Sequence, residues 1–302
     1  MKLIAMVTVG VCVFCATAYG QEIKSGLAFL KLGAGADAIA RGDAMTATAI
    51  GAQALFYNPA GMAETTESSL LVMHNENIVD VRNEILGGSM AMGNFALGLG
   101  LQAATVSDIE IRDAATIDPI GTFTSIDGAL TLGAAYKFSD EVAVGANIKA
   151  LIEKIYINDA FGAALDFGAM YRPAHSHLSF GAAIQNIGSM GVMNNESTIL
   201  PTTLRIGAAY SGILDDKNIY SYTGSLDAAK TFVDQDMHIR AGVQFAYESI
   251  FFVRTGYETG FDASGFSAGV GVKYHFIQFD YALSPYSQNY GLANTFSLKF
   301  DL

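Results

Sequence analysis

The side chains best suited to chemistry in this sequence are a pair of histidines and a glycine-rich run near the N-terminus. His175 and His177 follow Pro173 two residues apart, but no further ligand cluster accompanies them, which favours a solvated turn over a metal site. The run 33–38 has the composition of a dinucleotide-binding loop, yet no βαβ pattern surrounds it. A nucleophile elbow, a His-Glu-x-x-His helix and a phosphate-binding loop are also missing from the sequence. We therefore expect no catalytic, cofactor-binding or metal-binding residues, and a protein that is not an enzyme.

The composition limits the kinds of protein that this chain can be. Hydrophobic residues make up 51% of the 302 residues and charged residues only 15%, whereas a soluble domain has about 25% charged residues. Beyond the N-terminus, no run approaches the roughly 18 consecutive apolar residues of a transmembrane helix. Such a chain is too apolar to be disordered and lacks the segments of a helical membrane protein. A large soluble β protein and a transmembrane β-barrel remain.

The N-terminus has the layout of a secretory signal peptide. Lys2 precedes an apolar run over residues 3–13, and small residues follow over 16–20. We expect residues 1–20 to be removed, with cleavage after Gly20 or after Ala18; a short membrane anchor is the alternative. Cleavage would remove Lys2 and both cysteines, so the net charge of −12 becomes −13 and no thiol remains. This negative balance argues against nucleic acid as a partner.

From residue 69 onward, the chain is a series of segments that alternate between apolar and polar residues. The segments 238–247 and 295–302 are clear examples. Successive side chains of a strand point to opposite faces, so each segment has one apolar face and one small or polar face. Most segments exceed the roughly 9–11 residues that a tilted strand needs to cross a bilayer. We predict fourteen strands, to within one hairpin, at about 69–80, 83–92, 95–106, 124–138, 141–154, 159–173, 177–188, 202–212, 219–230, 237–248, 250–260, 265–275, 276–284 and 293–302.

The charged residues of these segments fall on the small or polar face. In a soluble sandwich that face would meet water, whereas in a barrel it would line the lumen. The signal peptide, the strand lengths and the hydrophobicity favour the barrel, with its apolar face against outer-membrane lipid. The candidate lumen network consists of Asp166, Arg205, Asp227, Arg240, Arg254 and Glu258.

Loop lengths predict the orientation of this barrel. The long connections 107–123, 189–201 and 285–292 all follow odd-numbered strands, as expected when both termini face the periplasm. We therefore predict an all-β fold, a transmembrane antiparallel barrel of about 14 strands over residues 69–302, in the bacterial outer membrane.

Residues 21–68, which precede the barrel, do not alternate. Alanine-rich stretches at 33–40 and 44–54 predict short helices, and Asn58 before Pro59 is a helix-start signal. A capped helix in a periplasmic tail is one reading of this segment. We favour a hatch, or plug, folded into the lumen, because a barrel of about 14 strands is too wide to be filled by its own wall.

The same region carries a family resemblance. Residues 33–44 followed by 54–63 resemble the N-terminal signature of the PorV/PorQ family, which belongs to the FadL-like outer-membrane barrels. The stretches 181–188 and 200–207 and the C-terminal strands agree with it, although the last residue, Leu302, replaces the usual final aromatic residue. The hatch motif within this signature is Tyr57, Asn58, Pro59, Ala60 and Gly61.

The resemblance implies a 14-stranded barrel with an N-terminal hatch. PorV-like members act in type IX protein secretion, where they associate with the translocon and receive cargo through its C-terminal signal domain, and this is the function that we expect from the resemblance. FadL-like proteins instead pass long-chain fatty acids or other hydrophobic compounds across the outer membrane. That alternative predicts an apolar pocket between hatch and wall and a kinked strand, for which Gly87, Gly88, Gly98 and Gly100 are candidates. A purely structural barrel is the third possibility.

Overall fold

The computed structural model describes residues 24–77, 81–115, 117–217, 219–234, 236–260, 265–286 and 291–302. The expected signal peptide, residues 1–20, lies outside the described residues. No helix in the described ranges is long and apolar enough to cross a membrane.

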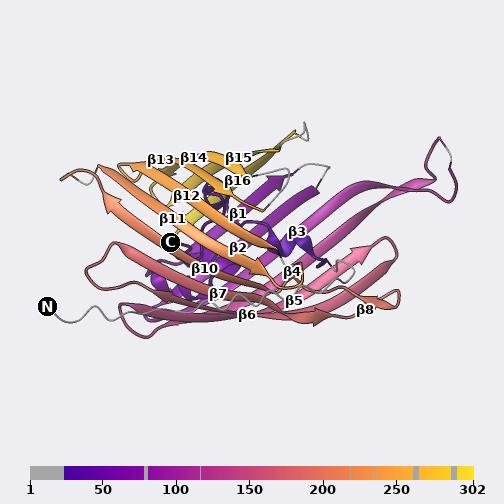
Figure 1. The fold of residues 1–302 in the computed structure, drawn as a ribbon, viewed down its shortest axis with the longest axis horizontal. Coiled ribbons are helices and arrows are strands. Elements are labelled where there is room, and N and C mark those ends of the chain that lie inside the picture. The colour runs from indigo at the N-terminus through magenta and orange to yellow at the C-terminus, as the bar shows by residue number, and fades with distance from the viewer. Residues whose placement is uncertain are drawn as a thin grey trace.

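Fourteen antiparallel strands form one closed barrel, in which β1 pairs with both β2 and β16 (Figure 1). The predicted fold class and strand number are therefore confirmed. The strands are β1 (Ser69–Glu76), β2 (Val81–Met92), β3 (Phe95–Ile111), β4 (Gly121–Lys137), β5 (Val142–Ile155), β6 (Asn158–Tyr171), β7 (Leu178–Met190), β10 (Thr203–Ile213), β11 (Tyr220–Thr231), β12 (Met237–Tyr247), β13 (Phe251–Glu258), β14 (Phe266–Tyr274), β15 (Ile277–Tyr286) and β16 (Gly291–Asp301).

The two faces of the wall differ as the alternation requires. In β12, for example, Ile239, Val243 and Phe245 are exposed on the outside, whereas His238 and Arg240 are buried on the inside. Large apolar side chains cover the outside of the other strands in the same way. A barrel in lipid needs this distribution, because the lipid contacts one face of every strand.

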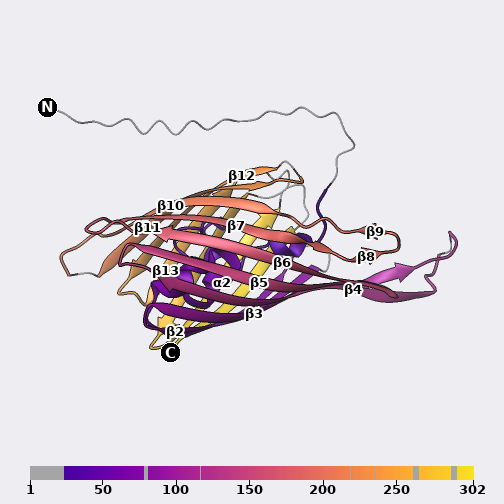
Figure 2. The same ribbon diagram turned by 90° about the horizontal axis from the view of Figure 1, so that it is seen from below.

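Two connections differ from the predicted loops. Residues 107–123 are mostly strand, since β3 continues to Ile111 and β4 begins at Gly121. The two strands pair to their ends across a register shift between Val106 and Ile109, and their hairpin projects beyond the other connections (Figure 2). The predicted loop 189–201 holds the end of β7 and a small hairpin of β8 (Val192–Met193) and β9 (Glu196–Ser197). The alternation fades in these segments because side chains beyond the lipid no longer need one apolar face.

The connections distinguish the two ends of the barrel. We call the end with connections 112–120 and 191–202 the long-loop end, and the end with the turns 93–94 and 275–276 the short-turn end. The turn at His275 needs only two residues because His275 adopts a left-handed backbone conformation, with a φ of 54°. This tight turn explains why no loop is visible in the sequence between the two strands.

Residues 24–68 lie inside the barrel as the hatch (Figure 2). The hatch begins with η1 (Ala28–Lys31) at the long-loop end and continues through α1 (Ala36–Ile39) to η2 (Gly51–Gln53), α2 (Ala54–Tyr57) and η3 (Pro59–Glu64). Of the predicted helical stretch 44–54, only residues 51–54 are helical, because residues 44–50 form turns and extended chain. Contacts with the wall, rather than the helix propensity of alanine, determine the path there.

Candidate functional site: the plugged lumen

The hatch motif connects three parts of the structure. The Asn58 side chain accepts a hydrogen bond from Ala60 N (3.3 Å) and so caps η3, while Pro59 takes the first position of that helix. Its amide nitrogen donates to Thr46 O in the hatch (2.9 Å) and to Ala169 O in β6 (3.0 Å). Asn58 is fully buried. It therefore joins two hatch segments to each other and to the wall.

Tyr57, the first residue of the motif, holds the hatch together internally. Its hydroxyl donates to Asp43 and accepts a hydrogen bond from Ala34 N (2.8 Å). Burial raises the pKa of Tyr57 well above its ordinary value, and the adjacent Asp43 carboxylate raises it further. The phenol thus stays protonated and able to donate.

Glycines in the wall allow the hatch backbone to approach closely. A Cβ at Gly145 would meet the backbone of Pro59 and Ala60, and a Cβ at Gly256 would meet that of Arg41 and Gly42. Gly61 of the motif is packed in the same way against the backbone of the hatch itself. Hatch and wall are therefore fitted to each other with no side chain between them at these points.

One group of charged residues surrounds Asp43. Its carboxylate lies 3.5 Å from an Arg205 nitrogen and 3.4 Å from an Arg240 nitrogen, and all three side chains are buried. Arg240 also pairs with Glu258, and the Arg205 guanidinium lies over the Tyr57 ring, 5.5 Å from its centroid. Nearby, Asp227 accepts a hydrogen bond from Thr46 N (2.8 Å).

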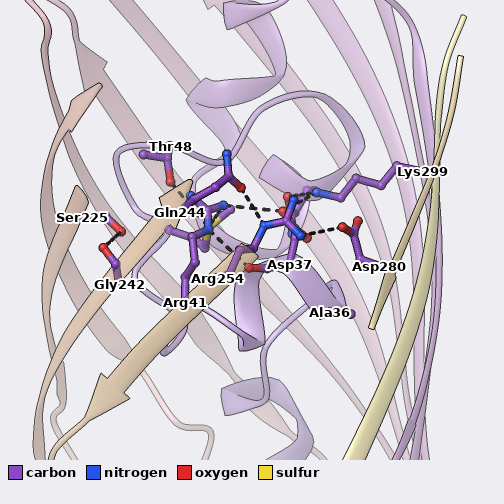
Figure 3. A network of polar contacts seen from close by, with 12 residues as sticks. Ala36, Asp37, Arg41, Thr48, Ser225, Gly242, Gln244, Arg254, Asp280 and Lys299 are labelled. Carbon is purple, nitrogen blue, oxygen red and sulfur yellow. Dashed lines mark hydrogen bonds and ion pairs between the residues drawn. The ribbon is translucent and has the colours of Figure 1, made fainter. Parts of the chain in front are cut away.

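A second group surrounds Asp37 (Figure 3). Lys299 of β16 lies 2.5 Å from this carboxylate and Arg41 lies 3.5 Å from it. Arg254 of β13 pairs with Asp280 at 2.7 Å. Burial raises the pKa of Asp37, but Lys299, Arg254 and Arg41 outweigh this effect and hold the pKa below its ordinary value. Asp37 is therefore ionised and anchors α1 to the wall.

A third group stabilises an irregularity in the wall. Asp166 lies 2.9 Å from the Lys149 amine, and it accepts hydrogen bonds from the Asn147 amide (2.9 Å) and from Asn186 N (2.8 Å). Here the β6–β7 register shifts between Leu165 and Phe167, and Asn186 adopts a φ of 60°. Asn186 is the extra residue of a β-bulge, and Asp166 holds it in place.

The six predicted lumen residues all lie on the inner face, but they belong to three groups rather than one network. Arg205, Arg240 and Glu258 meet around Asp43 with Asp227 nearby, Arg254 joins the Asp37 group, and Asp166 lies at the bulge. Sequence reasoning missed the hatch partners Asp37, Arg41 and Asp43. These three charged residues lie within seven positions of a stretch that is otherwise rich in alanine and glycine, and this clustering could have indicated them.

The bulge interrupts the wall beside β7. β10 begins at Thr203 opposite Gln185, so residues 187–190 of β7 pair with β6 and have no partner in β10. We call this gap the β7–β10 seam. Residues 199–202 fill it: Asn186 donates to Pro201 O (3.3 Å), and Ile199 O accepts a hydrogen bond from Gly26 N (3.0 Å).

An apolar cluster inside the long-loop half adjoins the seam. Leu27 and Phe29 of the hatch pack there with Leu151, Met190 and Leu200, among other residues. The hatch also borders two further cavities, whose lining residues include charged side chains. By contrast, the pairing of β2 with β3 is unbroken, and Gly87, Gly98 and Gly100 pack against hatch side chains, so the expected kink there is wrong.

Among the described residues, no group of three or more histidine, cysteine or acidic side chains is placed to hold a metal ion. His175 and His177 are exposed in the turn between β6 and β7. The glycine-rich run 33–38 leads into α1 of the hatch, and no strand or βαβ unit adjoins it.

Several solved structures share this fold. The CymD monoaromatic hydrocarbon channel matches 92% of this chain and 99% of its own with a TM-score of 0.65 and 13% identity. The toluene transporter TodX of Pseudomonas putida matches 88% and 96% (TM-score 0.58, 12% identity). A FadL homologue of Pseudomonas aeruginosa matches 89% and 98% (TM-score 0.52, 12% identity). At these identities the likeness shows a shared FadL-like barrel fold.

The sequence comparisons identify a protein family. No curated protein matches the chain. The family model described as "Uncharacterised protein family (UPF0164)" matches residues 18–213, which is more than half of the chain and includes the hatch and the bulge. The chain therefore belongs to the UPF0164 family.

Proposed function

We propose that this protein is a bacterial outer-membrane barrel that passes small apolar molecules, such as long-chain fatty acids or hydrocarbons, from the long-loop end into the bilayer. The single observation that carries this proposal is the apolar cluster that ends at the β7–β10 seam. Leu200 belongs to both features: it packs against Leu27 and Phe29 in the lumen and lies in the segment that fills the seam. An apolar solute that displaced this segment would reach lipid without crossing the polar groups of the hatch.

The surroundings support this function. The exposed outer face is apolar, as a lipid-facing wall requires. The CymD and TodX structures, which share the fold, carry titles that describe a hydrocarbon channel and a toluene transporter. In this proposal the long-loop end faces outward, and the start of β1 and the end of β16 face the periplasm, after removal of residues 1–20.

A charge placed in the apolar route is expected to block it. With Leu200→Asp, uptake of a radiolabelled long-chain fatty acid by cells that express the barrel should fall by about tenfold or more, because an unpaired buried carboxylate costs several kcal/mol. Val192→Asp is the matched control, since Val192 is an exposed residue of the same connection. Both variants must first show the heat-dependent gel shift of a folded barrel. Equal uptake by the two variants would contradict the proposal.

A second function is favoured by the outer surface and by the sequence resemblance to the PorV/PorQ family. An apolar groove of about 570 Å³ crosses the outside of β10–β14, with Ala208, Gly224 and Ala241 among the small residues of its floor and Tyr210 and Leu226 among its larger borders. A membrane-embedded translocon subunit could dock there, and the barrel would then bind and shuttle cargo of type IX secretion through its C-terminal signal domain.

Deletion of the gene tests this second function. Surface attachment of proteins that carry type IX sorting domains should be lost in the deletion strain and restored by the intact gene. Restoration should fail with Gly224→Phe, which fills the groove where a Cβ meets open space. Unchanged secretion in the deletion strain would leave only the transport function.

A further inference from the structure

Two cavities whose linings include charged and polar side chains lie between the hatch and the wall, and Leu32, which lines the first of them, also packs against the apolar cluster. One, of about 220 Å³, extends to the long-loop end, where Asn77 and Tyr286 line it. The other, of about 480 Å³, extends to the short-turn end, where Arg172 and His177 line it. Both are bordered by the strands of the second half of the barrel, β12–β16 in the first case and chiefly β10–β16 in the second.

A single turn of the hatch separates the two cavities. Ile39, Gly42 and Asp43 line the first, whereas Asp37 and Arg41 line the second. These residues belong to α1 and the turn that follows it, which we call the septum (residues 36–43). Arg41 lines the second cavity and its neighbour Gly42 lines the first, so the barrier between the cavities is thin.

Polar contacts hold the septum against the wall. Ala36 N donates to the Ser297 hydroxyl (2.9 Å) and Gly42 N donates to the Ser267 hydroxyl (3.1 Å). Asp43 adds its ion pairs with Arg205 and Arg240. Small apolar contacts supplement these bonds, since Ala40 packs on Ala282 of β15. Water can replace the hydrogen bonds when the septum separates from the wall, whereas the buried ion pairs of Asp37 and Asp43 oppose separation, so the gate is closed at rest.

Hydrogen-bonding side chains line the first cavity. The Asn75 side-chain oxygen has no hydrogen-bond partner in the described part of the chain, although Asn75 is 6% exposed and lines the cavity. Ser284, Tyr286 and Thr295 line the same space. The hydroxyl groups of these residues are the hydrogen-bonding groups that a polar solute in this cavity would meet, whereas the Asn75 oxygen itself is covered by protein atoms.

The second cavity carries excess positive charge within an acidic protein. Arg41, Arg172, Arg254 and Lys299 line it, and Asp37 is the one carboxylate among its lining residues. Two of the cations have buried partners behind the lining, Asp280 for Arg254 and Glu64 for Arg172, which still leaves one cation in excess. A field of this sign attracts anions and repels cations.

We propose that the septum is the gate of an axial pathway for small hydrophilic solutes, neutral or anionic, such as short carboxylates. When residues 36–43 move away from β14–β16, the two cavities join into a continuous polar route along the second half of the barrel. The route is separate from the β7–β10 seam, since residues 187–190 and 199–202 line neither cavity. Axial passage of polar solutes and lateral passage of apolar ones can therefore succeed or fail independently.

Planar-bilayer recording tests the gate with the full chain from residue 21 onward, which contains no cysteine. Asp43→Asn, a release variant, is expected to raise the frequency of open-channel events about tenfold, since it weakens charge-assisted contacts of the septum. A double variant, Ser267→Ala with Ser297→Ala, gives a second release route that leaves the charges in place. Each variant must first show the heat-dependent gel shift of a folded barrel.

A reversible crosslink identifies the moving element. In the Asp43→Asn background, Ala40→Cys with Ala282→Cys should suppress the current when oxidised and restore it when reduced, while each single cysteine has no effect. The sign of the reversal potential in a KCl gradient should report preference for chloride, and Lys299→Gln should reduce that preference. A current that survives the oxidised crosslink, silence of both release variants, or selectivity for potassium would each overturn the proposal.

Discussion

Replacing Asp166 with alanine is expected to destabilise the folded barrel by about 3–5 kcal/mol, the usual cost of removing one partner from a buried ion pair. Lys149 would keep its charge at a site where its side chain is 8% exposed. Asn186 N and the Asn147 amide would lose their acceptor as well. The bulge that opens the β7–β10 seam depends on these bonds. The midpoint of urea unfolding in detergent micelles measures the effect.

Two further variants separate the charge from the geometry. Asp166→Asn keeps an acceptor for Asn186 N, but it leaves the buried charge of Lys149 with only the neutral Asn186 side-chain oxygen (2.7 Å) as a partner, so it should remain strongly destabilised. Adding Lys149→Met removes both charges and should recover most of the loss, as replacement of a complete buried pair generally does. Asp159→Ala, at an exposed position of the same strand, is the matched control. If Asp166→Ala unfolds at the same urea concentration as this control, the assigned role of Asp166 is wrong.

Asn58→Ala is expected to release the hatch without opening the barrel. The change removes a helix cap, which contributes about 1 kcal/mol, and leaves Thr46 O and Ala169 O without their donor, so the total cost is about 2–4 kcal/mol. The barrel strands retain their own ladders, so the gel shift should persist. Limited proteolysis should then cut within residues 43–64 at least about tenfold faster than in the wild type.

The same contact can be tested from the wall. A Cβ at Gly168 would lie only 2.0 Å from the Asn58 side-chain oxygen and would clash with it, so Gly168→Ala should accelerate the same cleavages. Gly93→Ala is the control for adding a methyl group to a glycine, because a Cβ there meets no atom within 4 Å, although its φ of 66° adds a local strain in the turn. Hatch cleavage that is unchanged in Asn58→Ala and Gly168→Ala would show that other contacts hold this segment.

The barrel could be predicted from sequence because lipid requires one apolar face on every strand. Each of the fourteen segments shows its apolar face locally, so the predicted bounds of β12 differ from the observed ones by a single residue. β3 and β4 extend beyond the apolar band, where an apolar face is no longer required, and the predicted bounds of these two strands were therefore too short. The bulge at Asn186 has a weak local signal because its cause, the Asp166 carboxylate, is 20 residues away in the sequence.

The interior of the lumen was harder to predict for a related reason. Asp43 meets Arg205 and Arg240, which lie more than 160 residues further along the chain, and Asp37 meets Lys299 at the last strand. The alternation of apolar and polar residues predicts which side chains point into the barrel. It does not predict their position along the barrel axis or which side chain of another strand or of the hatch they contact. The Asn58-Pro59 start of η3 was predictable because the capping oxygen and the capped N–H are two residues apart.

The wall glycines constrain the order in which this molecule is assembled. The hatch contacts β4–β6 through η3 and β14–β16 through α1, and its backbone lies directly against wall glycines such as Gly145 of β5 and Gly256 of β13. After β1 and β16 have closed the ring, these 45 residues could enter only through an end of the barrel and would have to be fitted to such close surfaces inside it. We therefore expect the hatch to be enclosed as the last strands are added, with the early strands and the hatch together serving as the template for β14–β16.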